Sequence, residues 1–334
     1  MDRIVIIGLG LIGGSLGMAL KAAGIKNTEL VGVDLERDAV GAAKKKGAVD
    51  VTVRLASEAV KGAQLIIVAT PILAMPEVFK EIAPHLSEGC IVTDTGSTKQ
   101  QVLRWAEELL PSNVSFIGGH PMAGKEVPGI GGASASLFQH ATYCITPSAS
   151  ASRMAVEVVV GLATTVGATP YFVAADEHDM LVAGISHLPL LMSSALVTMI
   201  TQNPSWDELS KLASSGFHDV SRLASSDINL SRGITLTNQA GMLHWLDSYL
   251  EVLRDYRRAL AENAEALLEK LSSARDARDQ WLLHLSEPQR DRLFQDLPTA
   301  GEQMMEMFMG GRLAQLLRQQ EDTLKEIESK HPRR

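Results

Sequence analysis

The sequence has little cysteine and no long apolar run. Only Cys90 and Cys144 occur in 334 residues. Two cysteines cannot form the disulfide framework of a small secreted protein, so we expect buried free thiols in a cytoplasmic protein. No stretch offers the roughly 18 consecutive apolar residues of a membrane span. The N-terminal run IVIIGLGLIGG contains glycines and follows no basic segment. The sequence therefore predicts neither a membrane span nor a signal peptide.

An excess of positive charge is also absent. The formal net charge is −8, and no basic stripe interrupts the sequence. Binding to nucleic acid or to an anionic membrane depends on such a stripe, so we expect neither partner. Apolar residues make up 46% and charged residues 21%, which is typical of a soluble globular protein. A chain of this length can form two domains, each with its own core.

The first half of the chain alternates short apolar runs with helical patterns. Strands that alternate with helices predict βαβ units and a mostly parallel, doubly wound sheet of the Rossmann type. The predicted strands are RIVIIG, ELVGVD, QLIIVAT, GCIVTDT, VSFIGG, TYCITP and TPYFVA, within residues 3–174.

The second half lacks strand signals and repeats apolar residues at helical spacing. Residues 175–286 predict successive helices, as in MLHWLDSYLEVLRDYRRALAENAEALLEKL. We expect a nucleotide-binding domain over 1–173 and an all-helical substrate and dimerisation domain over 174–334. The tail 291–334 is too short and too helical in pattern for a separate regulatory domain.

A glycine motif follows the first predicted strand. Gly8, Gly10 and Gly13 form a G-x-G-x-x-G between the strand RIVII and a helical pattern. The first glycine permits a tight turn, the second lets the backbone approach a pyrophosphate, and the third lets the helix pack on the strand. The amide groups at the helix start, including those of Leu11 and Ile12, then face the phosphates.

An acidic residue distinguishes between the two nicotinamide cofactors. Asp34 ends the strand ELVGVD, 21 residues after Gly13. A carboxylate there suits the two free ribose hydroxyls of NAD and repels the 2′-phosphate of NADP. Arg37 could bind that phosphate, although a solvated charge on a helix is the preferred interpretation. The sequence therefore predicts NAD.

Several polar residues follow predicted strands. Ligands bind open parallel sheets at the carboxyl ends of the strands. Thr70 and Pro71 follow one strand and are predicted to contact the cofactor. Residues 94–97 and Gly119–His120 follow two others.

The segment GGHPMAGKEVPG, residues 118–129, is rich in glycine and proline and predicts a loop. His120 in this loop would lie near the nicotinamide. Its imidazole could accept the proton of a substrate hydroxyl while a hydride leaves for the cofactor. Ser97 could bond the same hydroxyl. The alternative is a structural histidine that bonds to the loop backbone.

The sequence resembles the prephenate/arogenate dehydrogenases of tyrosine biosynthesis. The resemblance lies in GLGLIGGSLG, DTGSTK, FIGGHPMAGKEVPG, EHD, ISHLPLLMSSAL and GFHDVSRLASSD, in family order. It implies a dinucleotide-binding domain followed by a helical domain that forms a homodimer. It also implies oxidative decarboxylation of a cyclohexadienol that carries a pyruvyl or alanyl side chain, without a metal.

The resemblance also implies roles for individual residues. His120 accepts the hydrogen bond of the substrate hydroxyl, and Ser97 assists it. Arg222 binds a substrate carboxylate, Asp219 and Glu126 pair with that arginine, and His187 faces the substrate. Each of the last four has a structural alternative: Arg222 and Asp219 as a solvated helical pair, Glu126 as a surface charge, His187 as a satisfied core histidine. His178 and Asp179 are interpreted as structural.

The sequence departs from the family pattern near the substrate side chain. Leu230 and Ser231 stand where the family commonly has a Met-Trp pair, so the choice between prephenate and arogenate stays open. Lys125, Val127–Pro128 and His218 are further departures. A β-hydroxyacid or imine reductase is a remoter alternative, for which Lys211 is the only lysine in 175–230. A non-catalytic nucleotide sensor is a third.

Overall fold

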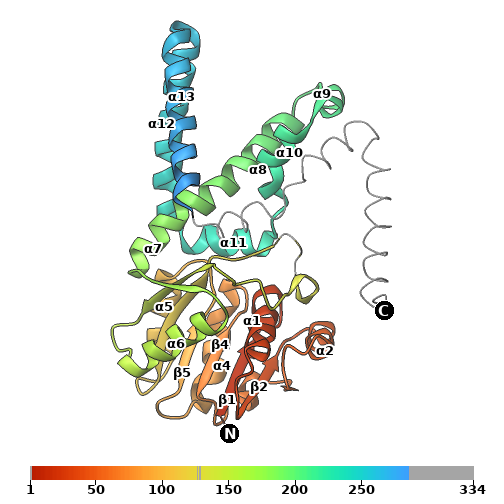
Figure 1. Cartoon of the computed structure of the whole chain (residues 1–334), viewed down its shortest axis with the longest axis vertical. Coiled ribbons are helices and arrows are strands. Elements are labelled where there is room, and N and C mark those ends of the chain that lie inside the picture. Colours follow the sequence, from red (N-terminus) through yellow and green to blue (C-terminus); the bar gives the residue numbers. More distant parts are fainter. Residues whose placement is uncertain (1, 126, 128, 286–334) are drawn as a thin grey trace, which may run out of the picture. The chain divides into compact units, whose positions relative to one another are not determined.

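The computed structural model describes residues 2–125, 127 and 129–285. Contacts group residues 1–270 into one compact unit and 271–334 into a second. The predicted helical tail over 291–334 lies outside the described residues. Figure 1 shows the first unit as a sheet flanked by helices and followed by further helices.

The N-terminal part is built on one eight-stranded sheet of order β3-β2-β1-β4-β5-β6-β7-β8. Neighbouring strands are parallel except β6 and β7, which are antiparallel. All seven predicted strands are present, and the two-residue strand β3 is additional. The strands are β1 Asp2–Ile7, β2 Thr28–Val33, β3 Val51–Thr52, β4 Leu65–Val68, β5 Ile91–Asp94, β6 Ser115–Pro121, β7 Thr142–Pro147 and β8 Thr169–Phe172.

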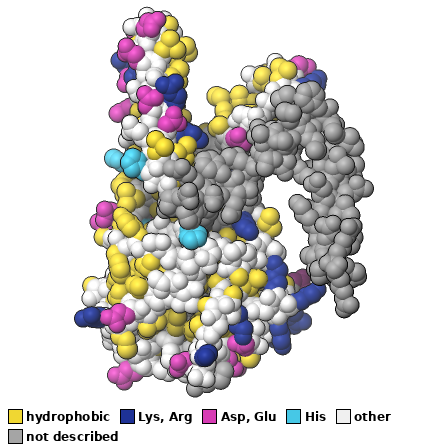
Figure 2. Space-filling model, in the orientation of Figure 1, with side chains coloured by type: hydrophobic (Ala, Val, Ile, Leu, Met, Phe, Trp, Pro, Cys, Tyr) yellow, Lys and Arg dark blue, Asp and Glu magenta, His cyan; other side chains and the backbone are white. Residues whose placement is uncertain are grey.

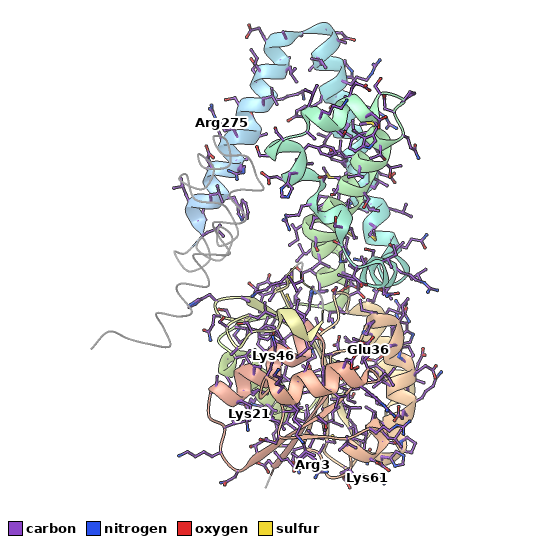
Figure 3. All side chains as sticks on the ribbon, turned by 90° about the vertical axis from the view of Figure 1, so that its right-hand side faces the viewer. Arg3, Lys21, Glu36, Lys46, Lys61 and Arg275 are labelled. Atoms are coloured by element: carbon purple, nitrogen blue, oxygen red, sulfur yellow. The ribbon has the colours of Figure 1, made fainter. Side chains whose placement is uncertain are left out.

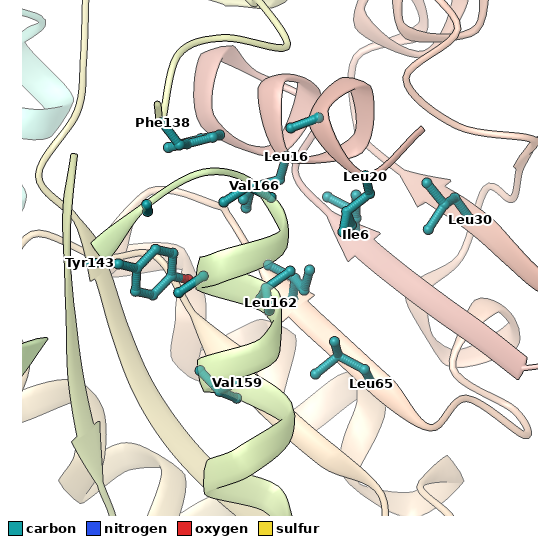
Figure 4. Packing of buried hydrophobic residues seen from close by; sticks show 14 of the residues in the cluster. Ile6, Leu16, Leu20, Leu30, Leu65, Phe138, Tyr143, Val159, Leu162 and Val166 are labelled. Atoms are coloured by element: carbon teal, nitrogen blue, oxygen red, sulfur yellow. The ribbon is translucent and has the colours of Figure 1, made fainter. Parts of the chain in front are cut away.

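Alternation along the strands divides the core between the two faces of the sheet. In β1, Ile6 belongs to one buried cluster and Val5 and Ile7 to the other. In β4, Ile67 and Ile66 divide in the same way, because successive strand side chains point to opposite faces. Figure 4 shows the first cluster, in which residues of α1 and α6 pack on the sheet. The second cluster packs under α3, α4 and α5.

The helices of this part lie where the βαβ pattern predicts them. They are α1 Leu11–Ala22, α2 Arg37–Lys45, α3 Ala56–Ala59, α4 Met75–Ile82, α5 Gln100–Leu109 and α6 Arg153–Thr165, with short 3₁₀ turns η1 Ile72–Ala74, η2 Ala83–His85 and η3 Ile130–Gly132. Both cysteines are buried and free, as expected. Burial raises the pKa of Cys90 to about 11, so this thiol stays protonated and unreactive near neutrality.

The described chain beyond β8 is entirely helical, which confirms the predicted change of pattern. The elements are α7 Ala175–Val182, η4 Ala183–His187, α8 Leu188–Thr201, α9 Trp206–Leu212, α10 Ser215–Ser221, η5 Arg222–Ser225, α11 Ile228–Thr237, α12 Gln239–Glu262 and α13 Ala264–His284. The turn η4 is a π-helical turn, a feature often found at functional sites. It joins α7 and α8 into one continuous helical run.

The run Ala175–Thr201 is long and apolar enough to cross a membrane by length and composition alone. Core helices of soluble proteins meet the same criterion.

In this chain α7 packs on α5, and α11 packs on η1. Both contacts lie at the carboxyl ends of the strands, so the helical part covers the edge of the sheet where a ligand is expected (Figure 1).

Candidate active site

The glycine motif has the geometry of a dinucleotide-binding turn. Gly8 has a φ of +96°, and a Cβ there would lie 2.6 Å from the Ala69 carbonyl oxygen. A Cβ on Gly13 would lie 1.9 Å from the Gly8 oxygen. A Cβ on Gly10 would meet no described atom within 4 Å. The first and third glycines are therefore required by the fold, whereas the second leaves space before the helix that a pyrophosphate could use.

Leu11 and Ile12 form the first turn of α1, as expected for residues whose amides face a phosphate. Asp34 directly follows β2 and holds this turn in place. Its carboxylate accepts the Leu9 N–H at 2.7 Å and the Glu36 N–H at 2.8 Å. A carboxylate has further lone pairs for a ribose hydroxyl. The exposed Arg37 begins α2.

The loop after β6 runs back to the glycine motif. Ser15 in α1 accepts the Ser134 N–H at 3.0 Å. Lys46, labelled in Figure 3, donates to the Gly131 oxygen at 2.9 Å. The loop that leaves the His120 strand is thereby anchored over the helix that would hold the phosphates.

Thr70 and Pro71 follow β4, at the sheet edge beside the glycine turn. Among the described atoms, the buried Thr70 hydroxyl oxygen has no hydrogen-bond partner. A buried hydroxyl without a partner is costly, so this group suits a ligand contact. The cofactor role of both residues stays a prediction.

A fully buried ion pair fixes the carboxyl end of β6. Lys99 Nζ bonds Asp94 Oδ2 and donates to the Gly119 oxygen at 2.7 Å, while Asp94 Oδ1 accepts the Gly119 N–H at 3.1 Å. Burial lowers the pKa of Lys99, and Asp94 opposes that shift. Both backbone groups of Gly119 are thereby held, and they set the position of the next residue, His120.

The expectation that 118–129 is loop from its start was wrong, because β6 continues through Pro121. The glycines serve close packing within the strand. A Cβ on Gly118 would lie 2.2 Å from Thr146 Oγ1, and one on Gly119 would lie 2.6 Å from the Asp94 carbonyl oxygen. His120 therefore stands on a strand, paired with Cys144 of β7.

His120 is the first member of a hydrogen-bonded chain. Its Nδ1 lies 2.9 Å from His178 Nε2, and His178 Nδ1 lies 2.8 Å from Asp179 Oδ1. The two rings meet edge to face at 70°. Desolvation lowers the pKa of His120 well below its usual value, and His178, Lys99 and His187 act in the same direction. His120 is therefore neutral near neutral pH and able to accept a proton.

Asp179 joins this chain to the nucleotide-binding part. Its Oδ1 accepts the Lys99 N–H at 2.7 Å, and its Oδ2 accepts the Gln100 N–H at 2.9 Å. These amides stand at the N-terminus of α5, where the helix dipole favours a negative charge. Asp179 is 5% exposed and comes from α7. A residue of the helical part thus caps a helix of the sheet domain.

His187 presents a second buried imidazole. The Asn238 Nδ2 donates to the Asp179 carbonyl oxygen at 2.6 Å and lies 3.2 Å from His187 Nδ1. Because a carbonyl oxygen only accepts, the amide nitrogen must be the donor to both. His187 Nδ1 therefore accepts, and Nε2 carries the hydrogen. Among the described atoms, His187 Nε2 is buried with no partner, so the interpretation as a satisfied core histidine does not fit.

The remaining predicted site residues that the structure describes come from other elements. Ser97 is half-buried in the turn between β5 and α5, beside Thr98, whose Oγ1 contacts Thr237 Oγ1 at 2.7 Å. Arg222 begins η5 and is exposed. Asp219 is exposed in α10, and its Oδ1 lies 3.4 Å from His218 Nδ1. Glu126 lies outside the described residues. The roles of all four stay predictions.

Sequence reasoning missed the partners that orient the two histidines. The sequence alone favours a structural interpretation of His178 and Asp179, and it suggests no role for Lys99 or Asn238. A signal existed for the first pair, since EHD is one of the stretches shared with the family. Nothing in the sequence marks Asn238, because its partners are 51 and 59 residues away.

Comparison with known proteins gives consistent matches over both parts. Residues 16–171 match the nucleotide-binding domain of prephenate dehydrogenase, and residues 174–273 match its dimerization domain. A prephenate dehydrogenase of Bacillus subtilis is 34% identical over 284 residues, covering 83% of this chain and 76% of the relative.

Two solved structures share the fold. An A. aeolicus prephenate dehydrogenase, in complex with hydroxyphenyl propionate and NAD+, matches with a TM-score of 0.78 and 26% identity over 84% of this chain and 98% of that one. A Synechocystis arogenate dehydrogenase matches with a TM-score of 0.72 and 31% identity over 84% of this chain and 99% of that one.

Proposed function

The chain belongs to the prephenate dehydrogenase family, and on that premise we propose that it catalyses the oxidative decarboxylation of prephenate to 4-hydroxyphenylpyruvate with NAD+. The observation that carries the proposal is the neutral His120. It stands at the carboxyl end of a nucleotide-sheet strand, and the buried His178 bonds its Nδ1. Such a group suits the removal of a hydroxyl proton during hydride transfer.

The chemistry requires few groups from the protein. Bound NAD+ would accept the hydride from the carbinol carbon. The oxidised ring then loses its carboxylate as carbon dioxide, because the product is aromatic. The protein orients the substrate, accepts one proton and balances two carboxylate charges. His120 supplies the proton acceptor, and Ser97 is proposed to bond the same hydroxyl.

The two carboxylates of the substrate need hydrogen-bond donors from the protein. Arg222 is proposed to bind one of them, because its planar guanidinium fits a carboxylate, with Asp219 and Glu126 as its pairing acids. The His187 Nε2–H supplies a second, neutral donor, since the Asn238 contact leaves that nitrogen protonated. Gly8, Gly10, Gly13 and Asp34 are proposed to hold the cofactor.

Arogenate, which carries an amine in place of the side-chain ketone, is the second candidate substrate. Leu230, 45% exposed near the start of α11, and Ser231 replace the aromatic pair that the family commonly has there. The arogenate dehydrogenase among the similar structures supports keeping this candidate.

The test is NADH formation from prephenate and from arogenate, with NADP+ replacing NAD+ in a parallel pair. We expect turnover of prephenate with NAD+ and its near-complete loss in His120→Asn with NAD+ affinity retained. His85→Gln, an exposed histidine of η2, is the matched control. Exclusive use of arogenate would make arogenate, and not prephenate, the substrate. Failure of both substrates would contradict the proposal and favour the reductase or sensor interpretation.

We also propose a homodimer formed through the helical part, in a cytoplasmic protein. The helices carry apolar side chains that the single chain leaves exposed (Figure 2). Those more than half exposed between 185 and 260 are Ile185, Met199, Leu212, Val220, Ile228, Leu236, Val252 and Leu260. The matching dimerization domain of the family supports the same assembly.

A further inference from the structure

The chain behind His120 has one arrangement of hydrogens when both rings are neutral. Asp179 accepts two backbone N–H groups, one at each carboxylate oxygen. A carboxylate only accepts, so His178 Nδ1 donates to it. The neutral His178 then offers a lone pair at Nε2, and His120 Nδ1 must donate to it. The remaining nitrogen of His120, Nε2, carries a lone pair.

This polarity of His120, in which Nδ1 donates a hydrogen bond and Nε2 accepts one, is the one that the chemistry needs. The substrate hydroxyl donates a hydrogen, and the His120 Nε2 lone pair accepts it. In the opposite tautomer His120 would present an N–H and could not act as a base. His178 and Asp179, buried at 1% and 5% exposure, therefore decide what His120 can do without reaching the substrate themselves.

The same chain can carry a proton. The hydroxyl O–H bond breaks as His120 Nε2–H forms, and the hydride leaves from carbon. The His120 Nδ1–H can then pass to His178 Nε2, which produces an imidazolium beside the Asp179 carboxylate. His120 is again neutral, and the positive charge lies next to the one described carboxylate that contacts either ring.

The reaction needs that proton back. Loss of carbon dioxide sends an electron pair into the ring and leaves a phenolate at the former hydroxyl oxygen. Reversal of the two transfers returns the proton to this oxygen, so the phenol forms with no net proton exchange. A proton that moved to solvent in the meantime would have to be replaced from solvent.

We propose that His178 and Asp179 are positioning residues that set the polarity of His120 and store the substrate's hydroxyl proton between hydride transfer and decarboxylation. The inference rests on the proposed function for its second half. Its first half, the polarity, is a property of the protein alone and can be measured without substrate.

The polarity is tested by nitrogen NMR of the whole protein carrying ¹⁵N-labelled histidine, with His120→Asn to assign the signals. We expect a protonated Nδ1 and an unprotonated Nε2 for His120 in the parent. In His178→Phe, which keeps a ring but removes its nitrogens, we expect the His120 tautomer to become mixed. A His120 signal protonated at Nε2 in the parent, or unchanged in His178→Phe, would overturn the proposal.

The storage step is tested by single turnovers in mixtures of light and heavy water. We expect a curved dependence of rate on deuterium fraction in the parent, since two protons move, and a straight one in His178→Gln. The Gln oxygen can still accept from His120 Nδ1 but cannot take its proton. We expect kcat to fall about 100-fold with KM and NAD+ affinity unchanged, and His85→Gln to match the parent.

The outcomes separate the two proposals. A straight line for the parent, or full kcat in His178→Gln, would overturn storage and leave the proposed function standing. An inactive parent would contradict the proposed function, while the NMR result would still decide the polarity.

Discussion

At the scale of single residues, the candidate site is organised by what lies behind each histidine. His120 and His187 have opposite polarity because their partners differ. Asp179, acting through His178, makes His120 an acceptor, whereas Asn238 makes His187 a donor. One imidazole can thus receive a proton while the other stabilises a negative charge.

Inversion of the second polarity should weaken substrate binding. In Asn238→Asp, a carboxylate would accept from His187 Nδ1–H, which leaves Nε2 as an acceptor. We expect the KM for prephenate to rise about 10-fold or more, the usual cost of losing a hydrogen bond to a charged group. NAD+ affinity should not change. Steady-state kinetics and a cofactor titration measure both, with Asn229→Asp, exposed on α11, as the control. An unchanged KM would contradict the donor role.

The buried His187 should also make the protein sensitive to acid. Desolvation lowers its pKa to about 4 from an ordinary value of 6.5, with Asp179 opposing that shift and His178 adding to it. Between these two pH values the unfolded state therefore binds more protons than the folded state. The contribution of His187 to the free energy of unfolding is complete above pH 6.5 and is lost as the pH falls toward 4. A shift of this size corresponds to about 3 kcal/mol.

Denaturant unfolding across this range measures the effect. We expect the free energy of unfolding of His187→Gln to fall less between pH 6.5 and 4 than that of the parent. His218→Gln changes a histidine whose side chain is 79% exposed and should follow the parent. Equal acid sensitivity of His187→Gln and the parent would contradict the lowered pKa of His187.

At the scale of elements, the turn between β1 and α1 assigns a different task to each glycine. Gly13→Ala forces a Cβ against the Gly8 oxygen and should destabilise the fold, whereas Gly10→Ala meets open space. We expect Gly10→Ala to keep the parent melting temperature but to bind NAD+ at least 10-fold more weakly. Melting curves and calorimetric titration of both variants measure this. Tight NAD+ binding by Gly10→Ala would place the pyrophosphate elsewhere.

Helices and strands could be predicted from the sequence where a regular spacing of apolar residues runs through the element itself. The seven longer strands, α1, α5 and α6, and the change to helices near residue 175 follow from apolar spacing. The two-residue β3 carries too little pattern. The predicted strand VSFIGG ends at Gly119, and the continuation of β6 through His120 and Pro121 was missed because a stretch rich in glycine and proline signals a loop. In the structure Gly118 and Gly119 instead allow the close approach of Thr146 and Asp94. The contact of His178 with His120 spans 58 residues, and no local pattern reports such a distance.

At the scale of the whole molecule, the stripe of apolar residues on α12 predicts assembly. Leu243, Leu250, Leu253 and Leu260 are 39–70% exposed and recur at three- and seven-residue spacing. We expect Leu250→Glu with Leu253→Glu to halve the mass measured by light scattering. Met154→Glu with Val158→Glu, on exposed positions of α6, should leave it unchanged. A parent that is monomeric would contradict the proposed homodimer.

The contact between α7 and the N-terminus of α5 ties acid–base chemistry to the docking of the two parts of the chain. His120 comes from the sheet, and the pair that orients it comes from the first helix after the sheet. On the proposed mechanism, neither half alone would hold a competent base. A hybrid that joined the nucleotide-binding half of one family member to the helical half of another would need matching surfaces at this joint. The halves of this enzyme are therefore constrained to evolve as partners and not as interchangeable modules.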